Sequence, residues 1–209
     1  MSKRVFDIVV ASIGLLLFSP LMLIIAVLIE LDSPGPIFYR APRVGKDGHL
    51  FRMYKFRTMV ADAEKICSAI TLDQDPRITR IGAHLRGSRL DEIPQLTNVL
   101  RGEMSMVGPR PEAPYYVEKY SPEQREVLKV KPGMTGPAQM AFRHEEEALS
   151  NPEMLDDEYM SVILPPKLAM DLKYIERRSC MFRWLSHPPR GNDTIQQQCR
   201  DSLQQDTHI

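Results

Sequence analysis

Residues 8–29, IVVASIGLLLFSPLMLIIAVLI, form an apolar run without a single charged side chain. As a helix, a run of this length measures about 33 Å, enough to cross a bilayer core of about 30 Å. A cleaved signal peptide fits poorly, because the run is long and no A-x-A-like cleavage site follows it. A buried helix of a soluble domain is the remaining alternative, but such helices are seldom so uniformly apolar. The run therefore favours a membrane-embedded helix within residues 1–32.

Ser19 and Pro20 lie at the middle of this run. Proline removes one backbone hydrogen bond and collides with the carbonyl four residues earlier, so a kink is expected there. Ser19 can donate to the carbonyl that the proline leaves free, which is how such breaks are tolerated in lipid. Basic residues flank the run on both sides: Lys3, Arg4, Arg40, Arg43 and Lys46. The positive-inside rule therefore selects no orientation, and composition supports a spanning helix and a helix that enters and leaves on one face equally.

Overall charge gives no indication of a partner, because 27 Lys and Arg balance 27 Asp and Glu. The distribution is uneven, since residues 38–59 are rich in Lys and Arg whereas the region after Pro111 is rich in acids. A basic segment beside an apolar terminus indicates an anionic surface or substrate. No nucleic acid partner is expected. The three cysteines, Cys67, Cys180 and Cys199, follow no zinc or disulfide pattern and are expected to be reduced thiols.

Beyond the apolar run, the pattern predicts an α/β domain that is mainly α with one small β-hairpin. The hairpin has expected strands near residues 37–40 and 50–56, joined by the turn Gly45–Gly48. Helices are expected after residues 77–85, over 115–130 with a new start at Ser121, and over 151–178 with a division at Pro165-Pro166. Residues 131–136 are expected to form a loop. Three parts result: residues 1–32 in the membrane, a compact domain over 33–187, and a polar, disordered tail over 188–209.

Two adjacent carboxylates, Asp91 and Glu92, stand within the stretch GSRLDEIPQLTNVLRGEMSMVGPRP. Pro94 is best tolerated in a first helical turn, which places both acids at a helix N-terminus. Acids are common there because they complement the helix dipole, so a helix start is the simpler interpretation. A helix N-terminus also favours phosphate, however, and the rigid turn that follows presents the fork of Arg110. A catalytic interpretation therefore stays open beside the structural one.

The catalytic interpretation assigns a chemical role to each acid. Asp91, in a field of basic residues that includes Lys55 and Arg57, would stay ionised and could attack phosphorus. A divalent cation held by the oxygens of Asp91 and Glu92 would offset the charge of a diphosphate. No histidine is placed for proton transfer, so Glu92 is the candidate base.

Four stretches carry a resemblance to a known family: FSP at 18–20, YKFRTM at 54–59, residues 85–111 around the acidic pair, and KPGMTGPAQ at 131–139. In this order they resemble the bacterial sugar transferase family, the small monotopic phosphoglycosyl transferases that start glycan assembly on a polyprenyl phosphate carrier. The resemblance covers residues 3–139 in order and weakens toward about residue 185. Several independent motifs in the right order make chance a poor explanation.

The resemblance implies transfer of a sugar 1-phosphate from a UDP-sugar to polyprenyl (undecaprenyl) phosphate, with Mg²⁺ as cofactor and release of UDP. It assigns to Asp91 the attack on the β-phosphate, which gives a covalent phosphosugar-enzyme, and to Glu92 the activation of the polyprenyl phosphate. The pair also places the metal. The residues expected to contact phosphate are Lys55, Arg86 and Arg110, joined by Arg57, and those of the nucleotide-side loop are Pro132, Gly133, Thr135 and Gly136.

The same resemblance makes the N-terminal helix re-entrant at Ser19-Pro20. It implies a place in the inner leaflet of the bacterial cytoplasmic membrane, with interfacial helices and the catalytic domain facing the cytoplasm. The expected products serve exopolysaccharide, capsule, O-antigen (lipopolysaccharide) or glycoprotein assembly. The sugar, the pathway and the oligomeric state, a homo-oligomer included, stay open at this point.

Two departures from the family pattern weigh against a fully typical member. Residues 140–146 replace a short Asn-Gly-Arg-like segment, and Ser186-His187-Pro188-Pro189 interrupts the apolar C-terminal helix that members usually continue. The second departure supports an alternative function, a catalytically impaired, membrane-anchored relative that binds lipid or a protein partner.

Overall fold

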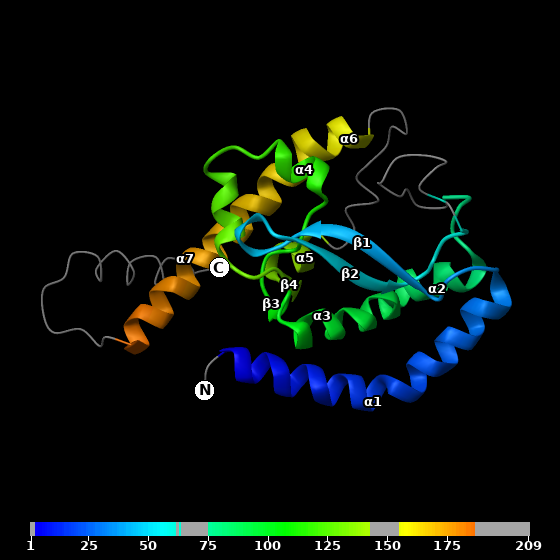
Figure 1. Ribbon diagram of the computed structural model, residues 1–209. Helices are drawn as coiled ribbons and strands as arrows, with labels where there is room; N and C mark the ends of the chain where they lie inside the picture. The colour runs from blue at the N-terminus through cyan, green and yellow to red at the C-terminus, as the bar shows by residue number, and fades with distance from the viewer. Residues whose placement is uncertain (1–2, 62, 64–74, 143–154, 187–209) are drawn as a thin grey trace, which may run out of the picture.

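The computed structural model describes residues 3–61, 63, 75–142 and 155–186. The expected tail over 188–209, most of the atypical segment after Gln139, and the cysteine side chains lie outside the described residues. Within them, elements follow the order shown in Figure 1. The first half contains α1 (Lys3–Asp32), β1 (Phe38–Val44), η1 (Lys46–Gly48), β2 (Leu50–Phe56), α2 (Arg80–Ser88), η3 (Leu90–Gln95) and α3 (Leu96–Arg101). The second half contains β3 (Ser105–Val107), α4 (Pro114–Glu118), η4 (Gln124–Lys129), β4 (Gly133–Thr135), α5 (Pro137–Ala141), α6 (Leu155–Glu158), η6 (Tyr159–Ile163) and α7 (Leu164–Ser186).

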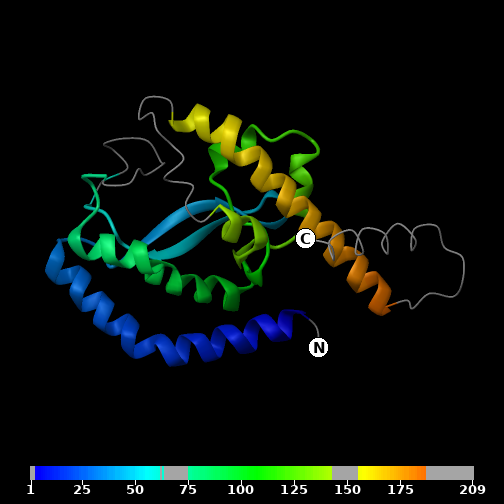
Figure 2. The same ribbon diagram turned by 180° about the vertical axis from the view of Figure 1, so that it is seen from behind.

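These elements stack in layers. The row formed by α2, η3 and α3 lies between α1 and the hairpin, and α4 with α6 and α7 covers the far side (Figures 1 and 2). The expectation of a mainly helical domain with a small hairpin is thereby confirmed. The antiparallel hairpin pairs Phe38 with Phe56 and Val44 with Leu50, so its first strand continues past the expected end at Arg40.

The second half differs from the expectation in two places and agrees with it in a third. Residues 131–136 are not all loop, because β4 pairs in parallel with β3. The new start at Ser121 is confirmed by reciprocal capping: Gln124 Oε1 accepts from the Ser121 N–H at 2.9 Å, and Ser121 Oγ accepts from the Gln124 N–H at 3.3 Å. The expected division at Pro165-Pro166 is wrong, because the helix continues without a gap from α6 through the π-helix η6 into α7, and only its geometry changes, from π to α, at Leu164.

Helix α1 bends in its middle without breaking (Figures 1 and 2). Pro20 lies inside it and cannot donate to the carbonyl of Leu16, four residues earlier. Ser19 Oγ donates to that carbonyl at 2.8 Å, which is the compensation expected from the sequence. Among the described residues, α1 is the one helix long and apolar enough to cross a membrane. Much of its apolar surface is open, with Leu16 79% and Leu31 80% exposed.

Both ends of α1 are tied to the same domain by polar contacts. At the N-terminal end, Arg4 donates to the carbonyls of Val99 at 2.6 Å and Leu100 at 2.7 Å, at the C-terminal end of α3. One turn later, the buried carboxylate of Asp7 accepts from Ser105 Oγ at 2.9 Å and from the Met106 N–H at 3.1 Å. The first turns of α1 are therefore fixed against α3 and β3.

The C-terminal end of α1 is fixed in a similar manner. Asp32 Oδ2 accepts from the Ile81 N–H at 3.1 Å, in the first turn of α2. Arg57, buried at the end of the hairpin, donates to the carbonyls of Ser33 at 2.5 Å and Pro34 at 3.1 Å. Between its two ends, α1 packs on η3 and α3 through the fully buried Ala11 and the partly buried Leu15, Leu21 and Met22.

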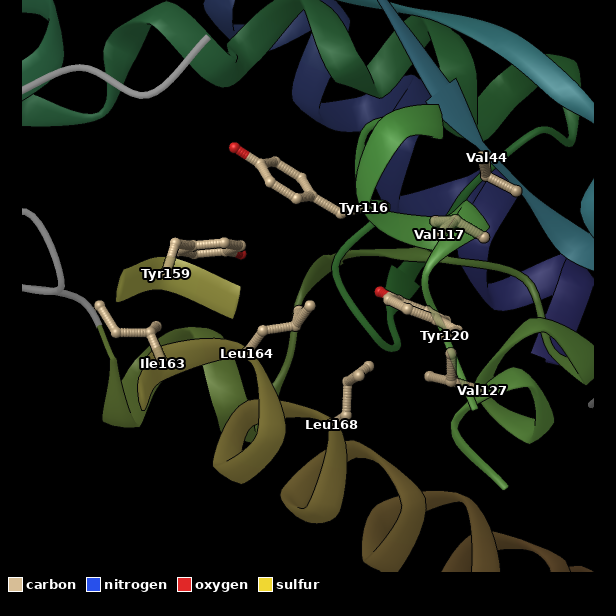
Figure 3. Close-up of a cluster of buried hydrophobic side chains, with 9 residues drawn as sticks. All are labelled: Val44, Tyr116, Val117, Tyr120, Val127, Tyr159, Ile163, Leu164 and Leu168. Atoms are coloured by element: carbon tan, nitrogen blue, oxygen red, sulfur yellow. The ribbon is translucent and has the colours of Figure 1, made fainter. Parts of the chain in front are cut away.

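Two further clusters hold the layers together. One, formed by Ile25, Ile29, Phe56 and Leu85, joins α1 to the hairpin and α2. The other lies on the far side of the domain and joins the end of β1 to α4, η4, η6 and α7 (Figure 3): Val44, Tyr116, Val117, Tyr120, Val127, Tyr159, Ile163, Leu164 and Leu168. The candidate site lies between these clusters, where the hairpin meets η3.

Candidate active site

The acidic pair lies in the first turn of η3, a 3₁₀-helix, not at the start of an α-helix. Arg89, with φ of 59°, is left-handed; it ends α2 and starts η3. Non-glycine residues seldom adopt this conformation, so the surrounding structure must hold Arg89 in it, and the chain changes direction there. It turns the side chains of Asp91 and Glu92 toward the hairpin, where they are 8% and 11% exposed.

Two cations meet the acidic pair, one from β2 and one from the turn after β3. Lys55 Nζ lies 2.8 Å from Glu92 Oε1 and 3.8 Å from Asp91 Oδ2. Arg110 donates to Glu92 Oε1 at 2.8 Å and to Oε2 at 3.5 Å. Asp91 Oδ1, by contrast, is buried and has no hydrogen-bond partner. The two acids are therefore unequal, because Glu92 Oε1 accepts from both cations whereas Asp91 Oδ1 has no partner.

The pKa values of Asp91 and Glu92 are shifted in opposite directions. Burial raises the pKa of Asp91 above its ordinary value, although the charge of Lys55 opposes that shift. Burial would raise the pKa of Glu92 as well, but the charges and hydrogen bonds of Lys55 and Arg110 outweigh it and hold that pKa well below its usual range. Burial lowers the pKa of Lys55, against the attraction of Glu92. A poorly solvated carboxylate thus lies beside one that stays ionised.

The other expected phosphate contacts are arranged differently. Arg86, in the last turn of α2, is half-buried and its charge lowers the pKa of Asp91, against the larger effect of burial. Arg57 points away from the acidic pair and caps the C-terminal end of α1, as described above. Lys55 and Arg110 therefore contact the pair, Arg86 acts on Asp91 through its charge, and Arg57 is bonded to the end of α1 instead.

The expected nucleotide-side loop packs backbone to backbone against the turn that carries Arg110. The Gly108 N–H donates to the Thr135 carbonyl at 2.9 Å, and the Gly133 N–H donates to the Pro109 carbonyl at 2.7 Å. A Cβ on Gly133 would lie 2.1 Å from the Gly108 nitrogen, and one on Gly136 would lie 2.4 Å from the Gly108 oxygen. These glycines allow close approach, and the loop from Pro132 onward thereby holds Arg110 in place.

Sequence reasoning missed Asn98, which is fully buried in α3. Its Oδ1 accepts from the Tyr54 N–H at 3.0 Å, and its Nδ2 donates to the Arg52 carbonyl and to Glu103 Oε2, each at 2.8 Å. The amide therefore fastens β2, next to Lys55, to the helix that follows the acidic pair. The one signal in the sequence is an amide within the apolar stripe of α3.

The acidic pair could supply two carboxylate ligands to a Mg²⁺ ion. Mg²⁺ is usually held by one or two carboxylates together with substrate phosphates and water, not by an all-protein cage. Asp91 offers a buried oxygen without a partner, and Glu92 is the adjacent carboxylate. No group of three or more His, Cys, Asp or Glu side chains suited to a metal occurs within the described residues.

The chain was compared with known proteins. The bacterial sugar transferase family matches residues 1–185. A Bacillus subtilis relative, provisionally named an undecaprenyl-phosphate N-acetylgalactosaminyl 1-phosphate transferase, is 52% identical over 121 residues, which cover 58% of this chain and 68% of the relative. The Escherichia coli UDP-glucose:undecaprenyl-phosphate glucose-1-phosphate transferase is 40% identical over 189 residues, 86% of this chain and 37% of that enzyme. The exopolysaccharide production protein ExoY of Rhizobium meliloti is 40% identical over 160 residues, 69% of this chain and 71% of ExoY.

Proposed function

The chain belongs to the bacterial sugar transferase family, and we propose that it transfers a sugar 1-phosphate from a UDP-sugar to a polyprenyl phosphate, as a phosphoglycosyl transferase. Two of the relatives above are named as transferases that use undecaprenyl phosphate, and a third is named for exopolysaccharide production. We therefore place the reaction at the start of glycan assembly on undecaprenyl phosphate, with exopolysaccharide as the first pathway to test.

One observation carries the proposal: Asp91 Oδ1 is buried and unpartnered, and the other oxygen of the same carboxylate lies 3.8 Å from Lys55 Nζ. A carboxylate oxygen in this state lacks the hydration that would stabilise it, so it is available as a nucleophile toward phosphorus. Lys55 lies beside Asp91 and Arg110 contacts the adjacent Glu92, so both can neutralise the charge that spreads over the phosphoryl oxygens. The same arrangement suits both displacements of a two-step transfer.

The balance of atoms fixes the leaving group. Asp91 Oδ1 forms a bond to the β-phosphorus of the UDP-sugar, and the bond between that phosphorus and the oxygen bridging to the α-phosphate breaks. The oxygen leaves with the α-phosphate, so the first product is UMP, and the expected release of UDP is wrong. In the second step an oxygen of the polyprenyl phosphate attacks the same phosphorus. The aspartyl bond breaks, and Asp91 is regenerated as a carboxylate beside a polyprenyl diphosphate sugar.

We assign Glu92 a different part from the one expected. Its pKa is held well below the usual range by Lys55 and Arg110 after burial is overcome, which makes it a weak proton acceptor. A phosphate monoester has a second pKa near 6, so the acceptor is largely a dianion at neutral pH and needs no strong base. Glu92 then serves to position Lys55 and Arg110 next to Asp91. Mg²⁺, bound by Asp91 and Glu92 with the substrate phosphates, would supply further charge neutralisation.

We also propose that α1 enters and leaves the membrane on one face. Its 30 residues would measure about 45 Å as a straight helix, so the ends of a spanning helix would lie on opposite faces. Both ends are nevertheless bonded to one domain, Arg4 and Asp7 to α3 and β3, and Asp32 to α2. Because the UDP-sugar is soluble and the acceptor is a membrane lipid, this arrangement suits a domain on the cytoplasmic face of the bacterial inner membrane.

Epitope tags at the two termini test this topology. In sealed inside-out vesicles, we expect added protease to remove an N-terminal and a C-terminal tag equally fast, because both lie on the outer, cytoplasmic face. A spanning α1 would protect the N-terminal tag while the C-terminal tag is lost. Vesicles opened with detergent serve as the control in which both tags are cleaved.

The activity is tested with purified protein in nanodiscs that contain undecaprenyl phosphate and Mg²⁺. UDP-glucose, UDP-galactose and their two N-acetylated amino-sugar counterparts, each carrying a radiolabelled sugar, are supplied in turn. We expect at least one to release UMP and to transfer label to the lipid, in amounts that match. If no donor labels the lipid above an enzyme-free control, the proposed function is wrong.

A further inference from the structure

Glu112 stands two residues after Arg110 and is tied to three other elements. Its carbonyl accepts from the Val44 N–H at 3.0 Å, at the end of β1. Its Oε1 accepts from the hydroxyl of Tyr159 in η6 at 2.8 Å and lies 3.5 Å from Nζ of Lys167 in α7. Tyr159 is 6% exposed and Lys167 is 4% exposed, so water competes little for these contacts.

We call the contacts of Glu112 with Tyr159 and Lys167 the Glu112 clamp. The π turn of η6 determines that Tyr159 and Lys167 lie on the same side of the helix. Tyr159 and Lys167 are eight residues apart, which in a regular α-helix would separate them by about 80° around the axis. Residues 159–163 form a π turn, which holds one residue more than an α turn. The extra residue returns Tyr159 and Lys167 to one face, as residues seven apart lie in an α-helix. Lys167 Nζ accordingly donates to Tyr159 Oη at 3.0 Å and lies 5.1 Å from the centre of its ring.

The connection between Glu112 and Arg110 is stiff. Pro109 and Pro111 flank Arg110, and each proline fixes its own φ and restricts the residue before it. On the other side, Gly108 is held by its hydrogen bond to Thr135 in β4. The turn that carries Arg110 is therefore anchored at both ends, by β4 at Gly108 and by the Glu112 clamp.

We propose that Tyr159 and Lys167 are positioning residues for Arg110: by holding Glu112 they keep the Arg110 guanidinium against Glu92 and directed at the substrate phosphates. Arg110 contacts Glu92 Oε1 at 2.8 Å, so a shift of Glu112 is transmitted to the acidic pair through a short, rigid segment. This inference rests on the proposed function, since Arg110 is taken to act on phosphate. It gives a role to the π turn, because π turns are rare and are often found at functional sites.

A double-mutant cycle tests the inference. Lys167→Met and Tyr159→Phe are each made in the wild-type chain and in an Arg110→Gln chain, and kcat for UMP release is measured. In the wild-type background we expect each to lower kcat about tenfold, and in the Arg110→Gln background to change it little, because the losses act through one residue. Tyr159→Phe removes a single hydroxyl and preserves packing. Lys173→Met, exposed on α7, and Tyr115→Phe, exposed on α4, are matched controls expected to retain full kcat.

A second readout does not depend on turnover. With ¹⁵N-labelled arginine, the side-chain Nε–H signal of Arg110, identified by its loss in Arg110→Gln, is recorded by nuclear magnetic resonance in the wild type and in Lys167→Met. We expect the signal to shift in Lys167→Met, because the guanidinium moves away from Glu92, 2.8 Å from it in the wild type. An unchanged Arg110 signal, or losses of kcat that multiply in the double variants, would overturn the inference while the proposed function stands. A wild type without activity toward any UDP-sugar overturns the function, and the Arg110 signal then decides the inference alone.

Discussion

Asp91→Asn is expected to slow UMP release by about 10³-fold or more, because the amide cannot form the bond to phosphorus that the carboxylate oxygen makes. The stability of the fold should not fall, since burial already disfavours the charged form of Asp91. The measurement is single-turnover UMP release with Mg²⁺ and no lipid acceptor. The wild type should release about one equivalent and retain sugar label on the denatured protein, as covalent catalysis requires. The variant should do neither.

Asp47→Asn is the matched control for this substitution. Asp47 lies in the exposed hairpin turn with φ of 56°, a conformation that asparagine tolerates well, and it is remote from the acidic pair. The Asp47→Asn variant should release UMP and retain the sugar label like the wild type. Label on denatured Asp91→Asn protein at the wild-type level would show that another residue is the nucleophile and would remove the main support for the mechanism.

Gly133→Ala is expected to have the largest effect on stability, at about 3 kcal/mol or more, because the added methyl has nowhere to go. It would lie 2.1 Å from the nitrogen and 2.6 Å from Cα of Gly108, which are backbone atoms that no rotamer change can move aside. The strands β3 and β4 must separate, and Arg110 shifts with Gly108. A displacement of about 1 Å at a substrate-positioning group can cost about 10²-fold in rate. Thermal unfolding in detergent and UMP release report the two effects.

Gly87→Ala provides the contrast. Gly87 is exposed in α2, and a Cβ there would meet no atom within 4 Å. Alanine should stabilise this helix by roughly 0.5–1 kcal/mol and leave the rate unchanged. If Gly133→Ala unfolded at the wild-type temperature, the close approach of β3 and β4 would not be a constraint on the fold.

Local patterns predicted the parts of the fold that local physics determines. The hairpin is predicted by two strand-like runs on either side of a glycine-containing turn, and Ser19 is predicted as the donor that compensates for Pro20. The acidic pair stood out because its neighbours in sequence are basic and its motif is specific. Its setting in a 3₁₀-helix was not predicted, since nothing in the sequence marks Arg89 as left-handed.

Contacts between distant segments could not be predicted in the same way. The parallel pair β3 and β4 has three residues in each strand, too few for a periodic signal. Arg57 is as basic as Lys55 and stands two residues away, yet only the fold determines that one caps α1 and the other meets Glu92. The π turn brings Tyr159 and Lys167 together on Glu112, a residue at least 47 positions earlier in the chain, and no local pattern reports that contact.

The anchoring of α1 has a consequence for the order of synthesis. Lys3 and Arg4 bind carbonyls that lie 104 and 95 residues later in the chain. At a translation rate of about 5–20 residues per second, the helix leaves the ribosome roughly 5–20 s before its docking surface is made. During that interval the apolar segment meets the membrane without the contacts that fix its ends. The final seating of α1 is therefore a late, post-insertion event, governed by the folding of the domain that is synthesised after it.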